Sequence, residues 1–247
     1  MHLCIDQGNS RTKVALFDHN GTLVKHFIYK SFTLADVNQL FALYPIEKSI
    51  ISSVVNIEPS VVNGMQRLSK RFVLFDHHTP VPLQNDYATP ETLGLDRLAA
   101  AVGAAALCPE KDILIIDAGS AITYDVLTKE GHYLGGNIAP GIKLRLESLH
   151  RLSKKLPLVE ADENVFIPLV AKNTREAIAA GVIRGVAFEV KGYIRALRAG
   201  RKNNDMEVFL TGGNAPFILN HVKDPLRFEK NLVLIGLNTI LQYDTNR

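Results

Sequence analysis

Short apolar runs of strand length recur along the first half of the chain, and segments with helical spacing lie between them. Polar turns join the first three runs so closely that they predict an antiparallel meander. The intervening segments repeat apolar residues on one helical face, and Thr33 is a suitable N-cap for the first of them. Strands are expected over 2–5, 12–17, 22–29, 49–55 and 72–75, and helices over 33–44 and 58–69.

The second half repeats this organisation after a proline-containing segment, 76–91, which predicts an irregular loop. Gly94 then precedes the alanine-rich run LDRLAAAVGAAAL, whose small side chains favour a helix packed inside the protein. A long helix over 174–199 should end at Gly200, with the cationic residues Arg198, Arg201 and Lys202 around its end. Further strands are expected over 113–117, 122–127, 132–138 and 207–211, and helices after Gly141 and over 232–243.

Two segments match each other and indicate an internal duplication: CIDQGNSRTKVALFD from Cys4 and IIDAGSAITYDVLTK from Ile115. Asp6 and Asp117 occupy equivalent places 111 positions apart, and a turn containing glycine follows the second run of each copy. A chain of 247 residues accommodates two such halves. We therefore expect two domains, over 1–108 and 109–247.

Composition and charge exclude several functional classes. The net charge is only +3, and the basic residues are scattered, so nucleic acid is not an expected partner. No apolar stretch approaches the ~20 residues of a membrane span, so we expect a soluble, cytoplasmic protein without a membrane partner. Cys4 and Cys108 are isolated in apolar surroundings and are expected to be free thiols.

The first copy, DQGNSRTK, has the residues of a phosphate-binding turn. Gly8 would let backbone N–H groups face an anion, while Asn9 and Ser10 would supply neutral donors. Lys13 would add positive charge, and Asp6 at the strand end would hold Mg²⁺ directly or through water. An ordinary hairpin turn is the alternative for this copy taken alone.

The second copy, DAGSAITYD, makes chance a poor explanation because the same pattern recurs in the second half. Ser120 and Thr123 offer hydroxyls to phosphate, whereas Asp117 and Asp125 offer carboxylates to a cation. Carboxylates facing an anionic nucleotide repel it unless a cation lies between them. A second cation besides Mg²⁺ is therefore expected.

Between the copies, GLDR places Asp96 at the start of the alanine-rich helix. A helix cap is one interpretation. The functional interpretation makes Asp96 the base that accepts a proton from an attacking hydroxyl, with Arg97 and Tyr87 binding the polar groups of that substrate.

Several weaker sequence features allow both a structural and a functional interpretation, and two common motifs are absent. The glycines of GGNIAPG (135–141) and TGGNA (211–215) suit either a tight turn or close approach to a ligand, a nucleoside in the case of TGGNA. Ala177, Gly181 and Gly185 form a small-residue stripe for helix packing within the chain or between subunits. His77 and His78 are expected to be solvated loop residues, because adjacent histidines rarely share a metal. The chain has neither GxxxxGK[ST] nor GxSxG, which argues against a P-loop and an α/β-hydrolase mechanism.

In this order and over nearly the whole chain, DQGNSRTK, GLDR, DAGSAITYD, GGNIAPG, NTREAIAAG and TGGNA resemble the type III pantothenate kinases. That family belongs to the acetate kinase, sugar kinase, Hsp70 and actin superfamily. The resemblance implies an α/β fold of two ribonuclease H-like domains, each a mixed five-stranded sheet with flanking helices, and a cleft between them. It also implies ATP-dependent phosphorylation of the primary hydroxyl of pantothenate to 4′-phosphopantothenate, the first step of coenzyme A synthesis.

The resemblance also implies roles for particular residues. Asp96 would be the proton acceptor, Asp117 would hold a monovalent cation, K⁺ or NH₄⁺, and the enzyme would be a homodimer. The residues implied to bind ATP are Asp6, Gln7, Gly8, Asn9, Ser10, Arg11, Thr12, Lys13 and Ser120. Those implied to bind pantothenate are Tyr87, Gly94, Leu95, Asp96, Arg97 and Thr174.

Two departures from the family pattern concern hydroxyl residues. Ser10 and Ser120 stand where the family usually has threonine, so each keeps the hydroxyl and lacks a methyl group. Arg11 adds a charge near the expected phosphates. Two alternatives stay open: a kinase of this fold for another small hydroxyl compound, such as a sugar, and a regulator that binds ATP or a coenzyme A intermediate without turnover.

Overall fold

The computed structural model describes residues 1–199 and 205–245, and its chain forms two compact units. The first unit comprises residues 1–110, 128–134 and the C-terminal stretch from Asn231, and the second comprises 111–127 and 135–230. The sequence-based boundary after residue 108 lies close to this division. However, the last helix, assigned by that prediction to the second half, belongs to the first unit. The predicted stop at Gly200, Arg201 and Lys202 lies outside the described residues.

The first unit is built on a mixed five-stranded sheet of order β3-β2-β1-β4-β5. β1 pairs antiparallel with β2 and parallel with β4, and β2 pairs antiparallel with β3, so the predicted meander is confirmed. Its strands are β1 (His2–Gln7), β2 (Thr12–Phe17), β3 (Leu23–Tyr29), β4 (Lys48–Ser53) and β5 (Arg71–Leu74).

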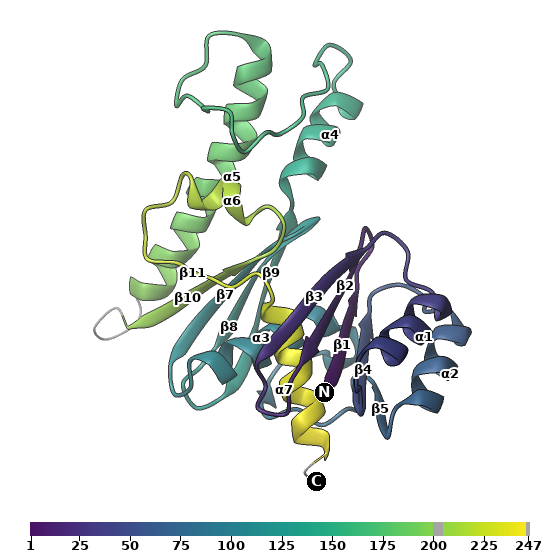
Figure 1. The fold of residues 1–247 in the computed structure, drawn as a ribbon. Coiled ribbons are helices and arrows are strands. Elements are labelled where there is room, and N and C mark those ends of the chain that lie inside the picture. Colours follow the sequence, from purple (N-terminus) through teal and green to yellow (C-terminus); the bar gives the residue numbers. More distant parts are fainter. Residues whose placement is uncertain (200–204, 246–247) are drawn as a thin grey trace. The chain divides into compact units, whose positions relative to one another are not determined.

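Two pairs of helices accompany this sheet. The first pair, α1 (Leu34–Leu43) and α2 (Pro59–Leu68), packs on the face that presents buried residues such as Leu3 and Ile5 (Figure 1). Thr33 caps α1, as predicted, through a capping box with Asp36. In the second pair, α3 (Leu95–Leu107) crosses α7 (Leu232–Thr245), and α7 also packs against β1, β2 and β4.

Glycine permits the close crossing of α3 and α7. A Cβ atom on Gly236 would collide with the Ala99 carbonyl, and one on Gly103 would collide with the Leu232 carbonyl. Eight residues of α3, from Arg97 to Ala104, are buried. The predicted interior position of the alanine-rich helix is therefore confirmed, and its partner is the C-terminal helix.

The second unit repeats the strand arrangement, with β7 in the place of β1. β7 pairs antiparallel with β8 and parallel with β10, so β9-β8-β7-β10-β11 has the same order as β3-β2-β1-β4-β5. The strands are β7 (Asp112–Ala118), β8 (Ala121–Leu127), β9 (His132–Pro140), β10 (Met206–Thr211) and β11 (Arg227–Phe228). The helices are α4 (Ile142–Leu152), α5 (Thr174–Ala199) and α6 (Ala215–Leu219).

The segment 76–91 is less irregular than its prolines predict. Gln84–Asn85 forms a short strand, β6, that pairs with His132 and Tyr133 at the start of β9, and Pro90–Thr92 forms one 3₁₀ turn, η1. This strand pairing extends the second sheet by a sixth strand. Within the described residues, no helix combines the length and apolarity that crossing a membrane requires.

Candidate active site

The first hairpin turn of the duplication carries Asp6 on β1, directly opposite Lys13 on β2. Residues directly opposite in an antiparallel pair point to the same face of the sheet, and Lys13 Nζ lies 3.9 Å from Asp6 Oδ2. Asp6 is 8% exposed, whereas the side chain of Lys13 is 34% exposed. A carboxylate and an ammonium group thus lie together at the base of the turn.

The backbone of this turn is closed by Gly8, whose N–H donates to the carbonyl of Arg11 at 3.1 Å. The amide of Gly8 itself is therefore already bonded. The φ of Gly8 is also not positive. Asn9, Ser10 and Arg11 are exposed at the tip, and no residue in the described part of the chain accepts a hydrogen bond from the amides of Asn9 and Ser10.

A pocket of about 450 Å³ lies within the first unit where β4 and β5 end. The end of β4 is tied to β1, because the Val54 N–H donates to the Gln7 carbonyl at 3.1 Å. Ligands of α/β proteins commonly bind outside the carboxyl ends of parallel strands, a rule that could have drawn attention to this segment. None of the residues that line this pocket is among the site residues predicted from the sequence. They are Ser53, Val55, Asn56, Ile57, Pro59, Val62, Asn63, Leu74, Phe75 and Asp76.

Asp96 lies in the first turn of α3 and is not its N-cap. The N-cap is Gly94, without a side-chain cap bond, and Asp96 Oδ1 accepts the N–H of Arg97 at 2.9 Å. A Cβ atom on Gly94 would lie only 2.6 Å from Asp96 Oδ1, so glycine leaves room for the carboxylate. The capping interpretation is therefore wrong in its geometry, and Asp96 remains partly exposed beside the helix start.

Arg97 and Tyr87 meet in the first unit, as the functional interpretation of GLDR requires. The Arg97 guanidinium carbon lies 5.6 Å from the centroid of the Tyr87 ring, within cation–π range. Arg97 is only 6% exposed. Because an arginine stacked on an aromatic ring has few rotamers left, the pair forms a fixed polar wall next to Asp96 in sequence.

The second hairpin turn is tighter than the first and is covered by other parts of its unit. The Gly119 N–H donates to the Ala121 carbonyl at 2.9 Å, and the Ser120 carbonyl accepts the Gly141 N–H at 3.1 Å. Asp117 is half-buried, while Ser120 at the tip is exposed. Ser120 therefore presents its hydroxyl to solvent from a turn whose backbone is held on both sides.

TGGNA packs directly against this second turn. The Asn214 N–H and side-chain amide donate to the carbonyls of Ala118 and Gly119, each at 2.8 Å. Gly212 has φ +93°, and a Cβ atom there would collide with Asp117 Oδ1 and the Ala118 backbone. TGGNA thus fixes the position of Asp117. The open side of TGGNA is at Gly213, where a Cβ atom would meet nothing within 4 Å.

GGNIAPG owes two of its glycines to packing within the second unit. A Cβ atom on Gly136 would collide with the Tyr124 carbonyl and with Asp125, and one on Gly141 would collide with the carbonyls of Gly119 and Ser120. Of the two interpretations of this motif, the structural one therefore holds at both positions. Asp125 is 1% exposed, because β9 covers it. Its carboxylate is therefore not accessible to a cation that enters from solvent.

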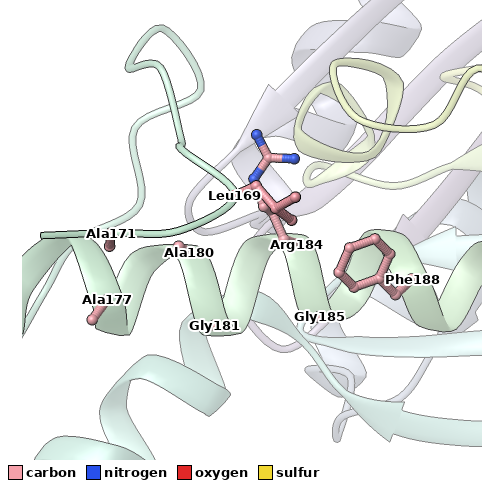
Figure 2. A pocket seen from close by; sticks show the side chains of 8 residues that line it. All are labelled: Leu169, Ala171, Ala177, Ala180, Gly181, Arg184, Gly185 and Phe188. Atoms are coloured by element: carbon pink, nitrogen blue, oxygen red, sulfur yellow. The ribbon is translucent and has the colours of Figure 1, made fainter.

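Thr174 is the first residue of α5 and is exposed. The small-residue stripe that follows it is not covered by its own chain, because Cβ atoms on Gly181 and Gly185 would meet nothing within 4 Å. Figure 2 shows this helix face together with Phe188 and the neighbouring segment that carries Leu169. They line a shallow pocket of about 310 Å³. Within the described part of its own unit, no segment covers the stripe at these two glycines.

The remaining cysteine and histidine candidates do not form a catalytic or metal site in the described part of the chain. Burial raises the pKa of the Cys4 thiol well above its ordinary value, so this free cysteine is unreactive. His77 and His78 are exposed in the loop after β5, as predicted. In the described part of the chain, no group of three or more His, Cys, Asp or Glu side chains is arranged to hold a metal alone.

Comparison with solved structures defines the class of fold. A Campylobacter jejuni protein, named as a member of the Baf family of transcriptional activators, is 22% identical and superposes with a TM-score of 0.65 over 99% of this chain and 100% of its own. A ROK hexokinase from Thermus thermophilus, 14% identical, has a TM-score of 0.52 over 98% of this chain and 99% of its own. The chain therefore has the two-domain, ribonuclease H-like fold that the sequence predicted.

Comparison of sequences gives the family. The model of the type III pantothenate kinase family matches residues 2–196. Type III pantothenate kinases of Phocaeicola vulgatus and Bacteroides fragilis are 42% and 41% identical to this chain, over 99% and 100% of both sequences respectively. The chain belongs to the type III pantothenate kinase family, and the resemblance inferred from its motifs is confirmed.

Proposed function

We propose that this kinase transfers the γ-phosphoryl group of ATP to the primary hydroxyl of pantothenate, giving 4′-phosphopantothenate for coenzyme A synthesis. The observation that carries the proposal is the group at the start of α3: Asp96 beside Gly94, and buried Arg97 against Tyr87. These residues supply a base and a polar wall without any residue for a covalent intermediate. Family membership supports the choice of pantothenate as acceptor.

In the proposed reaction, Asp96 accepts the proton of the pantothenate hydroxyl as its oxygen attacks the γ-phosphorus. Phosphoryl transfer depends mainly on positioning and charge neutralisation, so a single carboxylate near the hydroxyl is sufficient. Gly94, Leu95, Arg97, Tyr87 and Thr174 would line the acceptor site. Gly94 contributes by leaving the carboxylate unobstructed.

The ATP phosphates would bind at the two hairpin turns. Asn9 and Ser10 in the first turn and Ser120 in the second are exposed donors, and Lys13 supplies positive charge at the base of the first. Gln7, Gly8, Arg11 and Thr12 complete the first segment. Gly8 shapes the turn through its bond to Arg11 instead of donating to phosphate.

Mg²⁺ fits the first turn as a metal shared with ATP. Asp6 is a hard oxygen donor at a strand end, and the absence of any described three-residue cluster suits an ion that takes its other ligands from phosphate and water. When bound, Mg²⁺ would neutralise developing negative charge on the phosphates. The protein's own contribution is to place the carboxylate of Asp6 and the ammonium group of Lys13 on one face of the sheet.

A monovalent cation, K⁺ or NH₄⁺, would be held by Asp117. This carboxylate is half-buried and confined between Gly212 and Gly119, so its position is set before any ligand binds. A weakly hydrated cation there would offset repulsion between Asp117 and the nucleotide phosphates.

The test is turnover of purified protein with ATP, Mg²⁺, K⁺ and pantothenate, with product identified by mass spectrometry. Asp96→Asn should lower kcat by about 10²- to 10⁴-fold, because it removes a general base. Glu91→Gln, which removes an exposed carboxylate in η1 nearby in sequence, is the matched control and should retain wild-type turnover. Full activity in Asp96→Asn would exclude Asp96 as the base.

The rival functions predict different outcomes of the same assay. If a sugar or another small alcohol is the acceptor, a panel of hydroxyl compounds will give faster turnover than pantothenate. If the protein is a regulator, ATP will bind, as calorimetry would detect, without formation of a phosphorylated product. We also infer that the enzyme is cytoplasmic, so fractionation of cells should recover it in the cytoplasmic fraction.

We also propose that the kinase is a homodimer that pairs through α5. The uncovered stripe of Ala177, Gly181 and Gly185 lies beside Phe188, which is 54% exposed, and Leu169, which is 66% exposed. Small residues let a second helix approach closely, and the apolar neighbours provide area to bury. Gly185→Glu should convert the dimer to a monomer in light scattering, whereas Glu176→Lys, nine positions earlier and therefore on the opposite face of α5, should not. A wild-type monomer at micromolar concentration would exclude this interface.

A further inference from the structure

The loop that carries Tyr87 is held in place by contacts that the proposed reaction does not use. Short strand β6 precedes Tyr87, and the Gln84 and Asp86 N–H groups donate to the carbonyls of Gly131 and Tyr133, each at 3.0 Å. These residues all belong to the first unit. A strand of two residues has little stability of its own, so its position depends on side-chain contacts.

The principal side-chain contact is the hydrogen bond between His132 and Asp86. His132 Nδ1 lies 2.8 Å from Asp86 Oδ2, and Gln84 Nε2 donates to the other carboxylate oxygen at 3.0 Å. Together they hold the pKa of Asp86 below its ordinary value, with the His132 hydrogen bond as the largest cause. Asp86 is thus fixed on both oxygens immediately before Tyr87 in sequence.

Tyr87 itself is bounded on three sides. Its N–H donates to Asn85 Oδ1 at 3.1 Å, its ring lies 6.3 Å from the fully buried ring of Tyr133, and Arg97 covers it at 5.6 Å. Tyr133 directly follows His132 and so moves with it. The start of β9 therefore sets the position of Tyr87 through two successive residues, His132 and Tyr133.

We propose that His132 is a positioning residue for the pantothenate site: through its hydrogen bond with Asp86 it holds β6, and thereby Tyr87 and the Arg97 guanidinium, in the arrangement that binds the acceptor. The inference rests on the proposed function, because it assigns Tyr87 and Arg97 to pantothenate. His132 does not touch the substrate in this proposal. Its removal should weaken pantothenate binding and leave ATP binding and the chemical step unchanged.

The experiment compares KM for pantothenate, KM for ATP and kcat in the full chain. His132→Ala should raise KM for pantothenate by about three- to fivefold, the size expected for one partly exposed side-chain hydrogen bond, with the other two constants within twofold. His132→Asn, whose amide nitrogen can replace Nδ1 as donor to Asp86, should restore KM to near the wild-type value. Asp86→Asn combined with His132→Ala should be no worse than the poorer single variant, because both break one contact.

Lys70→Gln is the matched control, because it breaks an exposed ion pair with Glu47. Lys70 precedes β5 in the sequence, whereas the loop that carries Tyr87 follows β5. Lys70→Gln should change none of the three constants. An independent readout uses the absence of tryptophan from the chain. Tyr87→Trp introduces one tryptophan as a fluorescent reporter. Adding His132→Ala should lower the fluorescence anisotropy of this tryptophan if the contact between His132 and Asp86 restrains the loop.

The outcomes separate this inference from the proposed function. If wild-type protein does not phosphorylate pantothenate, the proposed function fails, and the anisotropy still tests the restraint. If wild-type protein does so and His132→Ala leaves KM for pantothenate unchanged, the positioning role is overturned. A parallel rise in KM for ATP or a drop in kcat would also overturn it, since it would indicate a general structural role.

Discussion

The two hairpin turns of the duplication have the same place in the same strand order, yet they differ in length and in what surrounds them. Gln7 pairs with Thr12 across the first turn and Ala118 with Ile122 across the second, so the first is one residue longer. Equivalent positions are therefore 111 residues apart before the turns and 110 after them. The later glycines agree with this shift, since Gly21 and Gly131 both have a left-handed φ, +83° and +84°.

The surroundings of the two turns explain how the same motif can bind phosphate in one turn and a cation in the other. The first turn carries its exposed residues, Asn9 and Ser10, on a longer tip with unbonded amides. The second is fixed from both sides by Asn214 and Gly141, and its aspartate is confined by Gly212. The longer, open turn suits contact with several phosphate oxygens, whereas the confined aspartate suits a site for one ion.

Among the changes that compare the two turns, removing the carboxylate of the first turn should have the largest effect. Asp6→Asn removes the proposed Mg²⁺ contact and should lower kcat by about 10²-fold at saturating ATP. Raising the Mg²⁺ concentration should recover part of the loss, which steady-state kinetics will measure. If Asp6→Asn and Asp117→Asn responded identically to Mg²⁺ and K⁺, the proposed division of roles between the turns would be wrong.

A second comparison concerns the glycines that shape the two turns. Gly212→Ala should lower the free energy of unfolding by about 2–4 kcal/mol, because it combines a positive φ with a collision at Asp117. Gly8→Ala should cost less than about 1 kcal/mol, since its φ is not positive and its nearest contact, the Arg11 carbonyl, would lie at 3.3 Å. Urea unfolding followed by circular dichroism checks both. Equal losses would contradict the difference described between the turns.

The cation at the second turn can be tested without mutation. Turnover in K⁺ should exceed turnover in Na⁺ by about tenfold at fixed ionic strength, because the two ions differ in size and hydration. In Asp117→Asn the difference should disappear. Persistence of K⁺ activation in that variant would place the cation elsewhere.

The smallest effect is expected where this chain departs from the usual threonines of its family. Ser10→Thr and Ser120→Thr keep the hydroxyl and add one methyl group, worth about 0.8 kcal/mol at most if it is buried. Both tips are exposed, so KM for ATP should change by less than about threefold in each. A tenfold change in either variant would mean that the tip becomes enclosed when ATP binds.

Periodicity and motif order determined much of this protein before any coordinates. Most strands and helices of both halves, the Thr33 cap and the interior position of α3 follow from local patterns, because hydrophobic spacing and capping act within a few residues. The two-residue strands β6 and β11 were not predicted. The family also follows from motif order, since six short motifs over the whole chain are specific together. Assignment of individual site residues to ATP, pantothenate or a cation remains a prediction.

Tertiary structure alone decided features that depend on residues far apart in the sequence. The C-terminal helix joins the first unit because Gly103 and Gly236 let α3 and α7 cross closely, and no local pattern encodes that pairing. The Gly8 amide bonds to Arg11, and the glycines of GGNIAPG are required by the backbone of neighbouring strands. Likewise, His132 meets Asp86 only after the sheet has formed. Sequence specifies local conformation, while steric fit and hydrogen-bond geometry between distant segments specify which residues meet.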